Sequence, residues 1–397
     1  AQKEPARAQR DTARQRDVAV ARLVASEAEN LRSSQPGLAK QLSIIAYRTD
    51  PASGTAALFS SLELPGVFNA GVPAWDISLN ADATRLAVST GSDVALWDTG
   101  KGRSLARLSA GGSRGVALSP DGRLVAAAVT DAGPGRTPVR LWDVSNPSAP
   151  RELTVPANQP AKVASLAFSP DGRMLALGLG NGRVRLWEIP ATGAPRTLRT
   201  LTGHKGAVDS VAFAPSGKLL ASAGLDGTVR LWDPLDPERT SALAKIAGGE
   251  PNARLSQEKI LRRVSFSPDG KTLAGPGDSK DIVFRLWDVQ NPGKPRRLAA
   301  AKKEGAAFNC PGELLSTAFS PDGKTLATVC NRDTLLWNLP SPTQPRLVNR
   351  LAGMGDSAGR TGPALFASRG HRLLHATYGG VYLWYVENTL RLSSVAT

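Results

Sequence analysis

A tryptophan recurs along this chain at a nearly constant interval. Seven of the eight tryptophans form the series, and successive members lie 45, 45, 45, 55, 50 and 47 residues apart. The members are Trp97, Trp142, Trp187, Trp232, Trp287, Trp337 and Trp384. A repeat of about 40–50 residues with one tryptophan in each copy is typical of a β-propeller, in which every copy supplies one four-stranded blade. The sequence therefore predicts an all-β, seven-bladed propeller.

Each copy of the repeat carries the same order of apolar runs and turns. A short apolar run, such as VAF at 211–213, comes before a tight turn, and a second small apolar run follows. A third run ends in Leu-Trp, and a proline-rich loop comes next. The tight turns are Asp82-Ala83, Asp121-Gly122, Asp171-Gly172, Ser216-Gly217, Asp269-Gly270, Asp322-Gly323 and Arg369-Gly370. Because Asp and Gly tolerate positive φ, this order predicts antiparallel strands joined by hairpins, with the outermost strand after the loop.

The first 57 residues follow a different pattern. Residues 1–17 contain no large apolar side chain, which predicts a solvated helix or a linker. Beyond them, apolar residues recur at helical spacing, and PG at 36–37 separates two such stretches. We predict two antiparallel helices and a third over 53–62, with coiled-coil pairing as the alternative. The domains are then a helical segment at 1–57 and the propeller at 58–397.

One copy, GHKGAVDSVAFAPSGKLLASAGLDGTVRLWD at 203–233, is more regular than the others. It opens with Gly-His and closes with Trp-Asp, and the chain resembles the WD-repeat family over about residues 66–390. In that family the fullest copies hold a histidine, a serine, an aspartate and the tryptophan in one hydrogen-bonded set. The matching residues are His204, Ser222, Asp226 and Trp232. The resemblance implies that this set stabilises its blade and performs no chemistry.

The stretch before the propeller carries a second resemblance. QRDVAVARLVASEAENLRSSQPGLAKQLSIIAYRTDP, at 15–51, is similar to the connector that precedes WD-repeat propellers in large actinobacterial signalling proteins. Those proteins often carry an upstream NTPase module of the STAND type or a helix-turn-helix DNA-binding module, and often a membrane-spanning helix before the connector. The resemblance implies that this chain is the C-terminal sensor portion of a longer protein, and a first residue other than methionine agrees with a fragment or a processed product.

No motif in the sequence points to catalysis. SPDGKT at 267–272 and 320–325 ends like a phosphate-binding loop, but Ser265 and Ala318 replace the first glycine of that loop. GLGNGR at 178–183 precedes a predicted strand, whereas a dinucleotide fingerprint precedes a helix. The sequence contains no HExxH or CxxC pattern. We therefore predict no catalytic residue, no metal ligand and no cofactor, and we expect that the protein is not an enzyme.

The two cysteines, Cys310 and Cys330, lie before the first strand and after the second strand of the sixth predicted blade. These strands run antiparallel, so both residues are expected at the same face of the disc. We hypothesise a disulfide between them, with two unpaired thiols as the alternative. A disulfide would suit an extracytoplasmic setting. The sequence therefore leaves two alternatives for the compartment: the chain is the extracytoplasmic part of a membrane-anchored protein, or it is cytoplasmic.

The formal net charge is +15, and the basic residues are spread along the chain. The tight turns and the proline-rich loops open on the same face of the propeller, because successive strands alternate in direction. That face is predicted to gather Arg123, Arg173, Lys218, Lys271 and Lys324 with Arg151, Arg196, Arg239, Arg296 and Arg346. Such a face suits an acidic partner or anionic lipid. The alternative is a solvated rim that aids solubility.

These patterns favour a non-catalytic protein–protein interaction platform, and the resemblances favour the sensor or regulatory propeller of a larger bacterial signalling protein. The alternatives are a hydrolase or lyase that uses the central channel, and a binder of nucleic acid or anionic membrane through the basic face. Nucleic acid is disfavoured because aromatic residues make up only 5% of the chain and most lie in predicted strands. We expect a monomeric propeller with protein partners that the sequence does not name, and a membrane-tethered upstream segment is compatible with it.

Overall fold

The computed structural model describes residues 4–31, 42, 45–46, 49–50, 74–129, 138–156, 162–247, 263–276, 282–302, 314–330, 333–351, 361–367, 372–377 and 380–385. The chain divides into two compact units, Ala1–Val67 and Phe68–Thr397. The boundary expected between residues 57 and 58 falls outside the described residues and stays a prediction.

The first unit contains helix α1 (Glu4–Leu31). Its sequence is rich in alanine, arginine and glutamate, which are strong helix formers, and Pro5 stands in the first turn, where no intrahelical hydrogen bond is lost. The expected N-terminal helical segment is confirmed, and the helix begins well before Val18. Ala21 is fully buried, whereas Leu23 is 72% exposed. Among the described residues, no helix combines the length and the apolar character needed to cross a bilayer.

The second and third predicted helices fall largely outside the described residues. Of the second, the structure describes Leu42, Ile45 and Ala46, which are helical, as is Thr49 just beyond it. The backbone N–H of Asp50 donates to the carbonyl of Ala46 at 3.0 Å, which is a helical hydrogen bond. The third helix, over 53–62, and the turn Arg369-Gly370 lie wholly outside the described residues.

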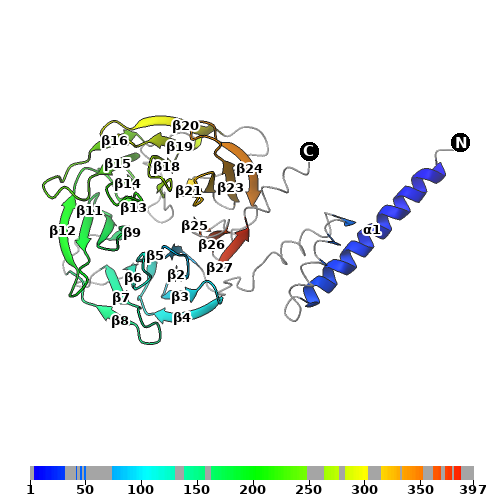
Figure 1. The fold of residues 1–397 in the computed structure, drawn as a ribbon, viewed down its shortest axis with the longest axis horizontal. Helices are drawn as coiled ribbons and strands as arrows, with labels where there is room; N and C mark the ends of the chain where they lie inside the picture. The colour runs from blue at the N-terminus through cyan, green and yellow to red at the C-terminus, as the bar shows by residue number, and fades with distance from the viewer. Residues whose placement is uncertain are drawn as a thin grey trace. The chain divides into compact units, whose positions relative to one another are not determined.

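The second unit is a seven-bladed β-propeller, as Figure 1 shows, and the fold predicted from the tryptophan period is confirmed. Each blade is one antiparallel sheet, and blade 1 has the strand order β1-β2-β3-β4. The first strands of blades 1 to 7 are β1 (Asp76–Leu79), β5 (Ser113–Leu118), β9 (Val163–Phe168), β13 (Val208–Phe213), β17 (Ser265–Phe266), β21 (Leu314–Phe319) and β25 (Thr361–Phe366). The second strands are β2 (Arg85–Ser89), β6 (Leu124–Val129), β10 (Met174–Leu179), β14 (Leu220–Gly224), β18 (Thr272–Pro276), β22 (Thr325–Cys330) and β26 (Arg372–Thr377).

The third strand of every blade ends at or next to the repeating tryptophan. These strands are β3 (Val94–Asp98), β7 (Val139–Asp143), β11 (Val184–Glu188), β15 (Thr228–Trp232), β19 (Ile282–Asp288), β23 (Asp333–Asn338) and β27 (Gly380–Tyr385). The outermost strands of blades 2 to 6 follow the proline-rich loops, as predicted, and that of blade 1 follows a loop without proline. They are β4 (Arg103–Leu108), β8 (Arg151–Leu153), β12 (Arg196–Leu201), β16 (Ala244–Ala247), β20 (Arg296–Lys302) and β24 (Arg346–Leu351).

The first strands surround the centre and close the ring. Each of β1, β5, β9, β13, β17 and β21 contacts the first strand of the next blade, and β25 contacts β1. The backbone N–H of Ala74 donates to the carbonyl of Thr377 at 2.9 Å and joins blade 1 to blade 7. The fourth strand expected for blade 7, from 66–68 or from 390–392, lies outside the described residues.

Blades 1 to 6 each pack their tryptophan against the preceding blade. Trp232 lies in one core cluster with Val184 and Leu186 of blade 3, and Trp187 lies with Leu141 of blade 2. The tryptophans that are at most 4% exposed are Trp142, Trp187, Trp232, Trp287 and Trp337. Burial of apolar surface stabilises a fold by about 25 cal/mol per Å². The indoles therefore hold neighbouring blades together mainly by apolar packing.

The tight turns share one hydrogen-bonded design. In blade 2, the Ser119 hydroxyl donates to Asp121 at 2.6 Å and accepts the N–H of Leu124 at 2.8 Å. The same pattern recurs at Ser169, Ser267 and Ser320. The turn glycines of blades 2 to 6 have φ of 70–72°, and blade 1 has Ala83 at φ 56° in that place. Alanine is strained in this left-handed region, which only glycine enters freely.

Candidate functional site

The four residues of the most regular repeat meet inside blade 4. The indole N–H of Trp232 donates to the Ser222 hydroxyl at 2.8 Å, and this hydroxyl lies 2.7 Å from Nε2 of His204. Nδ1 of His204 lies 2.9 Å from Oδ1 of Asp226. Because an indole can only donate, the hydroxyl donates onward to Nε2, and Nδ1–H donates to the carboxylate. The structure thus brings all four predicted side chains into one chain of hydrogen bonds.

The electrostatics of this set favour a neutral histidine beside an ionised aspartate. Burial lowers the pKa of His204, and the hydrogen bond to Asp226 opposes that shift only in part. Burial also acts to raise the pKa of Asp226, but hydrogen bonds from the Lys205 N–H, from His204 and from Thr228 hold it below its usual value. Every strong donor and acceptor in the set is used internally. The arrangement therefore fastens the loop before β13 to β14 and β15 and leaves no group free for acid–base chemistry.

Other blades keep fragments of the set. In blade 6 the indole N–H of Trp337 donates to Thr328 at 2.9 Å, and Thr328 pairs with Leu335 as Ser222 pairs with Arg230. In blade 3 the corresponding residue is Leu177, and the buried indole nitrogen of Trp187 has no hydrogen-bond partner among the described residues. Blade 3 is nevertheless a complete four-stranded sheet. A blade can therefore form without the polar set.

A buried ion pair crosses the hub of the propeller. Asp76 of β1 is 2% exposed, and it accepts the N–H groups of Ile77 at 2.7 Å and Val116 at 3.0 Å. It also accepts the guanidinium of Arg263, which precedes β17. Blades 1 and 5 are not neighbours in the ring, so this pair spans the centre. Burial raises the pKa of Asp76, although Arg263 and the two N–H donors oppose the shift.

The ten basic residues predicted to share one face are all exposed. Arg123, Arg173, Lys218, Lys271 and Lys324 follow the tight turns between first and second strands. The other residues of the set stand in or before the outermost strands, where the loops from the third strands end. The antiparallel order of every blade places both kinds of connection at the same end of the sheets. The strand order thus places these residues at the same end of their sheets, and a binding role for this face stays a prediction.

Carboxylates on the same face bind several of these arginines. The ion pairs are Arg151–Asp143 at 3.9 Å, Arg239–Asp236 at 3.4 Å, Arg296–Asp288 at 3.2 Å and Arg196–Glu188. In three of them the acid directly follows the blade tryptophan. These internal pairs reduce the net positive charge of the face. These pairs were not predicted, although in three of them the spacing of eight residues between acid and arginine is readable in the sequence.

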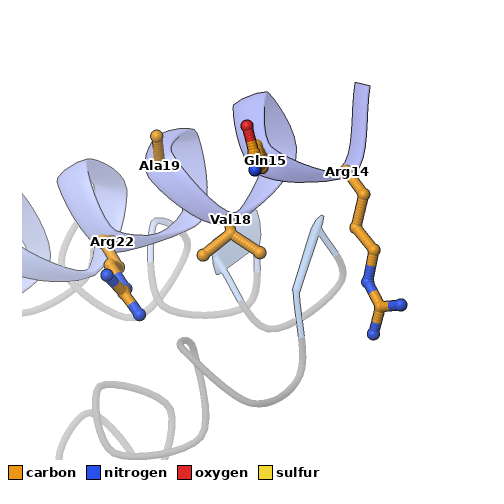
Figure 2. Close-up of a pocket in the computed structure, with 5 residues that line it drawn as sticks. All are labelled: Arg14, Gln15, Val18, Ala19 and Arg22. Carbon is orange, nitrogen blue, oxygen red and sulfur yellow. The ribbon is translucent and has the colours of Figure 1, made fainter. Parts of the chain in front are cut away.

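Other candidate features add no chemical group to the site. Cys330 is the last residue of β22, and Cys310 lies outside the described residues, so the disulfide stays a prediction. The described residues contain no group of three or more His, Cys, Asp or Glu side chains placed to hold a metal ion. A shallow hollow runs along α1 and is lined by Arg14, Gln15, Val18, Ala19 and Arg22 (Figure 2). In this view Arg14, Val18 and Arg22 extend from one side of the helix.

Comparison with protein families identifies two segments of the propeller. The profile described as "WD domain, G-beta repeat" matches residues 152–188 and 195–233. These segments are WD repeats. Each WD repeat begins in or just before the outermost strand of one blade and ends at the tryptophan of the next blade, so a repeat straddles two sheets. The second WD repeat contains His204, Ser222, Asp226 and Trp232, which agrees with the resemblance seen in the sequence.

Solved structures share the propeller fold that carries these WD repeats. The Cps50 (Swd1) β-propeller domain of Myceliophteria thermophila superposes with a TM-score of 0.60 at 16% identity, over 79% of this chain and 96% of that chain. Hydrazine synthase of Kuenenia stuttgartiensis superposes with a TM-score of 0.62 at 14% identity, over 79% of this chain and 95% of that chain. At such identities the likeness shows the fold alone. No curated protein matches the sequence.

Proposed function

We propose that this chain is a non-catalytic protein–protein interaction platform, and that it forms the sensor or regulatory propeller of a larger bacterial signalling protein. The first part rests on the WD repeats and on the preformed ring. The second part rests on the similarity of residues 15–51 to connectors in actinobacterial signalling proteins. A rigid surface binds partners with little ordering cost, because its loops are already held in place.

The observation that carries the proposal is the fastening between blades. Ser78, Ser165 and Ser210 accept N–H groups of Leu118, Val211 and Val264 in the following blade, at 2.9, 3.1 and 3.2 Å. From blade 3 to blade 6, a Cβ on each turn glycine would lie 3.6–3.7 Å from the proline of the preceding turn. The turns of blades 2 to 6 therefore form one continuous rim. The face on this rim, with its exposed basic residues, is the proposed contact surface for a partner with an acidic surface.

The basic face is tested by capturing partners with the whole chain. The test variant is Arg173→Glu/Lys218→Glu/Lys271→Glu, which reverses three exposed cations on the rim. The matched control is Lys162→Glu/Arg183→Glu/Lys205→Glu, which makes the same change in charge on connections at the other end of the sheets. Immobilised wild-type protein and both variants are incubated with lysate of the source cell at low and high salt, and bound proteins are identified by mass spectrometry.

We expect at least one protein that wild type and the control variant retain and the rim variant loses. Retention should weaken at high salt, because exposed ion pairs are screened. Equal retention by both variants would exclude the basic face as the contact surface. If wild type retains no protein above a bare matrix, the interaction platform itself is excluded.

A further inference from the structure

The third strand of blade 2 contains an arginine whose charge is neutralised within the blade. Arg140 stands two residues before the blade tryptophan, and its Nε donates to Oε1 of Glu152 at 2.7 Å. Its terminal nitrogens donate to the second oxygen of Glu152 and to the carbonyl of Ser109. The guanidinium carbon lies 5.3 Å from the ring centroid of Trp142. This place beside the tryptophan thus accommodates a bidentate carboxylate.

Blades 1 and 6 carry their cation on the outermost strand, directly opposite the position that Arg140 occupies in blade 2, and a carboxylate neutralises it. Arg107 of β4 and Arg350 of β24 lie opposite the residues that stand two before Trp97 and Trp337. Arg107 pairs with Asp93 at 3.0 Å, and Arg350 pairs with Asp333 at 2.6 Å. In blades 1, 2 and 6, a cation at this part of the sheet therefore has a carboxylate from its own blade.

Blade 4 carries cations in both register positions and lacks the carboxylate. Arg230 corresponds to Arg140, and Lys245 lies directly opposite Arg230. Like charges in directly opposite positions repel each other. Neither residue forms an ion pair within the described part of the chain, and Nε of Arg230 is buried without a hydrogen-bond partner there. Asp226, the nearby acid, is already occupied by His204, the Lys205 N–H and Thr228.

The surroundings of Arg230 are shaped to hold its guanidinium. A Cβ on Gly203 would lie 2.7 Å from a terminal nitrogen of Arg230 and 3.5 Å from the ring of Trp232. Glycine at this position therefore leaves room for the guanidinium beside the indole. Arg230 and Lys245 also contribute to lowering the pKa of His204, because both place positive charge near its ring. An anion placed between them would supply the bond that Glu152 supplies in blade 2.

We propose that Arg230 and Lys245 form a docking site for an aspartate or glutamate side chain of a protein partner. This inference rests on the proposed function, because it assigns one contact of an interaction platform. A carboxylate is the fitting class, since Glu152 binds the corresponding arginine through both oxygens. Planar bidentate pairing of arginine with a carboxylate provides both strength and geometric selection.

The test uses the full chain and a fluorescein-labelled hexaglutamate peptide, with hexaglutamine as the neutral probe. Fluorescence anisotropy measures the Kd of wild type, Lys245→Gln and Lys245→Glu. Lys245 is exposed, so both variants should fold, and a thermal melt checks this. We expect Lys245→Gln to weaken hexaglutamate binding about tenfold and Lys245→Glu to abolish it, because the new carboxylate would occupy Arg230 as Glu152 occupies Arg140. Relief of the like-charge repulsion should also raise the Tm of Lys245→Glu.

The matched control is Lys162→Gln, which makes the same substitution at an exposed lysine before β9, at the end of the sheets opposite the basic face. It should change the Kd for hexaglutamate less than twofold. If Lys162→Gln weakens binding as much as Lys245→Gln, the attraction is diffuse and the site is excluded. Unchanged binding by Lys245→Glu would also exclude it. Tighter binding of a phosphoserine peptide than of hexaglutamate would show that the site takes a phosphate group, which would overturn the assignment of a carboxylate.

The two proposals can fail separately. If Lys245→Glu captures the same cellular proteins as wild type, the carboxylate site is wrong and the platform stands. If wild type captures none, the platform is wrong whatever the peptide does.

Discussion

Blades 3 and 4 both bury a tryptophan between two sheets, but they surround its indole nitrogen with different residues. Both are four-stranded sheets, both bury their tryptophan against the preceding blade, and the first three strands of each lie within a matched WD repeat. Blade 4 surrounds its indole nitrogen with Ser222, His204 and Asp226, whereas blade 3 has Leu177 in the place of the serine. The sheets form equally well. The comparison indicates that apolar burial builds a blade, and that the polar set fixes the position of the preceding loop.

The largest effect should come from removing either tryptophan. We expect Trp187→Ala and Trp232→Ala each to lower the free energy of unfolding by about 3–5 kcal/mol, because both leave a large cavity between two blades. Urea denaturation followed by far-UV circular dichroism measures the loss. Trp97→Ala, at a half-buried position, is the control with a smaller expected loss. A cost for Trp232→Ala several times that for Trp187→Ala would show that the polar set, and not packing, dominates.

A buried histidine outside the polar set shows the effect of burial on a histidine pKa without the hydrogen bonds of that set. His375 of β26 is 0% exposed and contacts Thr334 at 3.2 Å. Burial lowers the pKa of His375 to about 4, against a hydrogen bond with the backbone of Gly362. The unfolded chain, with a histidine pKa of about 6.5, therefore binds the proton more readily. Stability from this group is present above pH 6.5 and is lost as the pH falls towards 4, by up to about 3 kcal/mol.

The measurement for His375 is the free energy of unfolding between pH 7 and pH 4. His375→Gln should show a shallower pH dependence than wild type over this window, because its side chain does not titrate. Parallel curves for the two proteins would contradict the assignment.

The smallest effect should come from trimming the polar set. Ser222→Ala leaves Trp232 and His204 each without a partner, and we expect a loss of about 2 kcal/mol. Thr328→Val in blade 6 leaves only Trp337 without its partner and should cost about 1 kcal/mol. Chemical denaturation of both variants ranks them. A larger loss for Thr328→Val would mean that the histidine contributes nothing to the set.

The fold was readable from the sequence because its determinants are local and repeated. The tryptophan period, the turns and the loops each recur in successive copies, so the blade number and the strand order followed from them. The four residues of the polar set were also predictable, because they lie within one repeat and match a known pattern. The serines of the turns were missed, although Ser119, Ser169, Ser267 and Ser320 each stand two residues before the turn aspartate.

The contacts that escaped prediction join residues that are distant in sequence or depend on register. Asp76 and Arg263 are separated by 187 residues, and no periodicity links them. The opposition of Arg230 and Lys245 depends on which residue of β16 faces β15, and the loop between these strands is longer than the corresponding loops. The sequence left residues 1–17 open between a solvated helix and a linker, because they carry no apolar stripe, and the structure shows α1 from Glu4. In those residues, only intrinsic helix propensity favours the helix over a linker.

The ion pair between Asp76 and Arg263 links two blades directly across the centre of the propeller. In a ring held only by contacts between neighbouring blades, one interface can open while the others stay intact. Displacement of one blade is then passed on only through its neighbours. With Asp76 bound to Arg263, a pull on the strand that begins blade 1 reaches blade 5 directly. Displacement of β1 is therefore resisted by blade 5 as well as by the neighbouring blades.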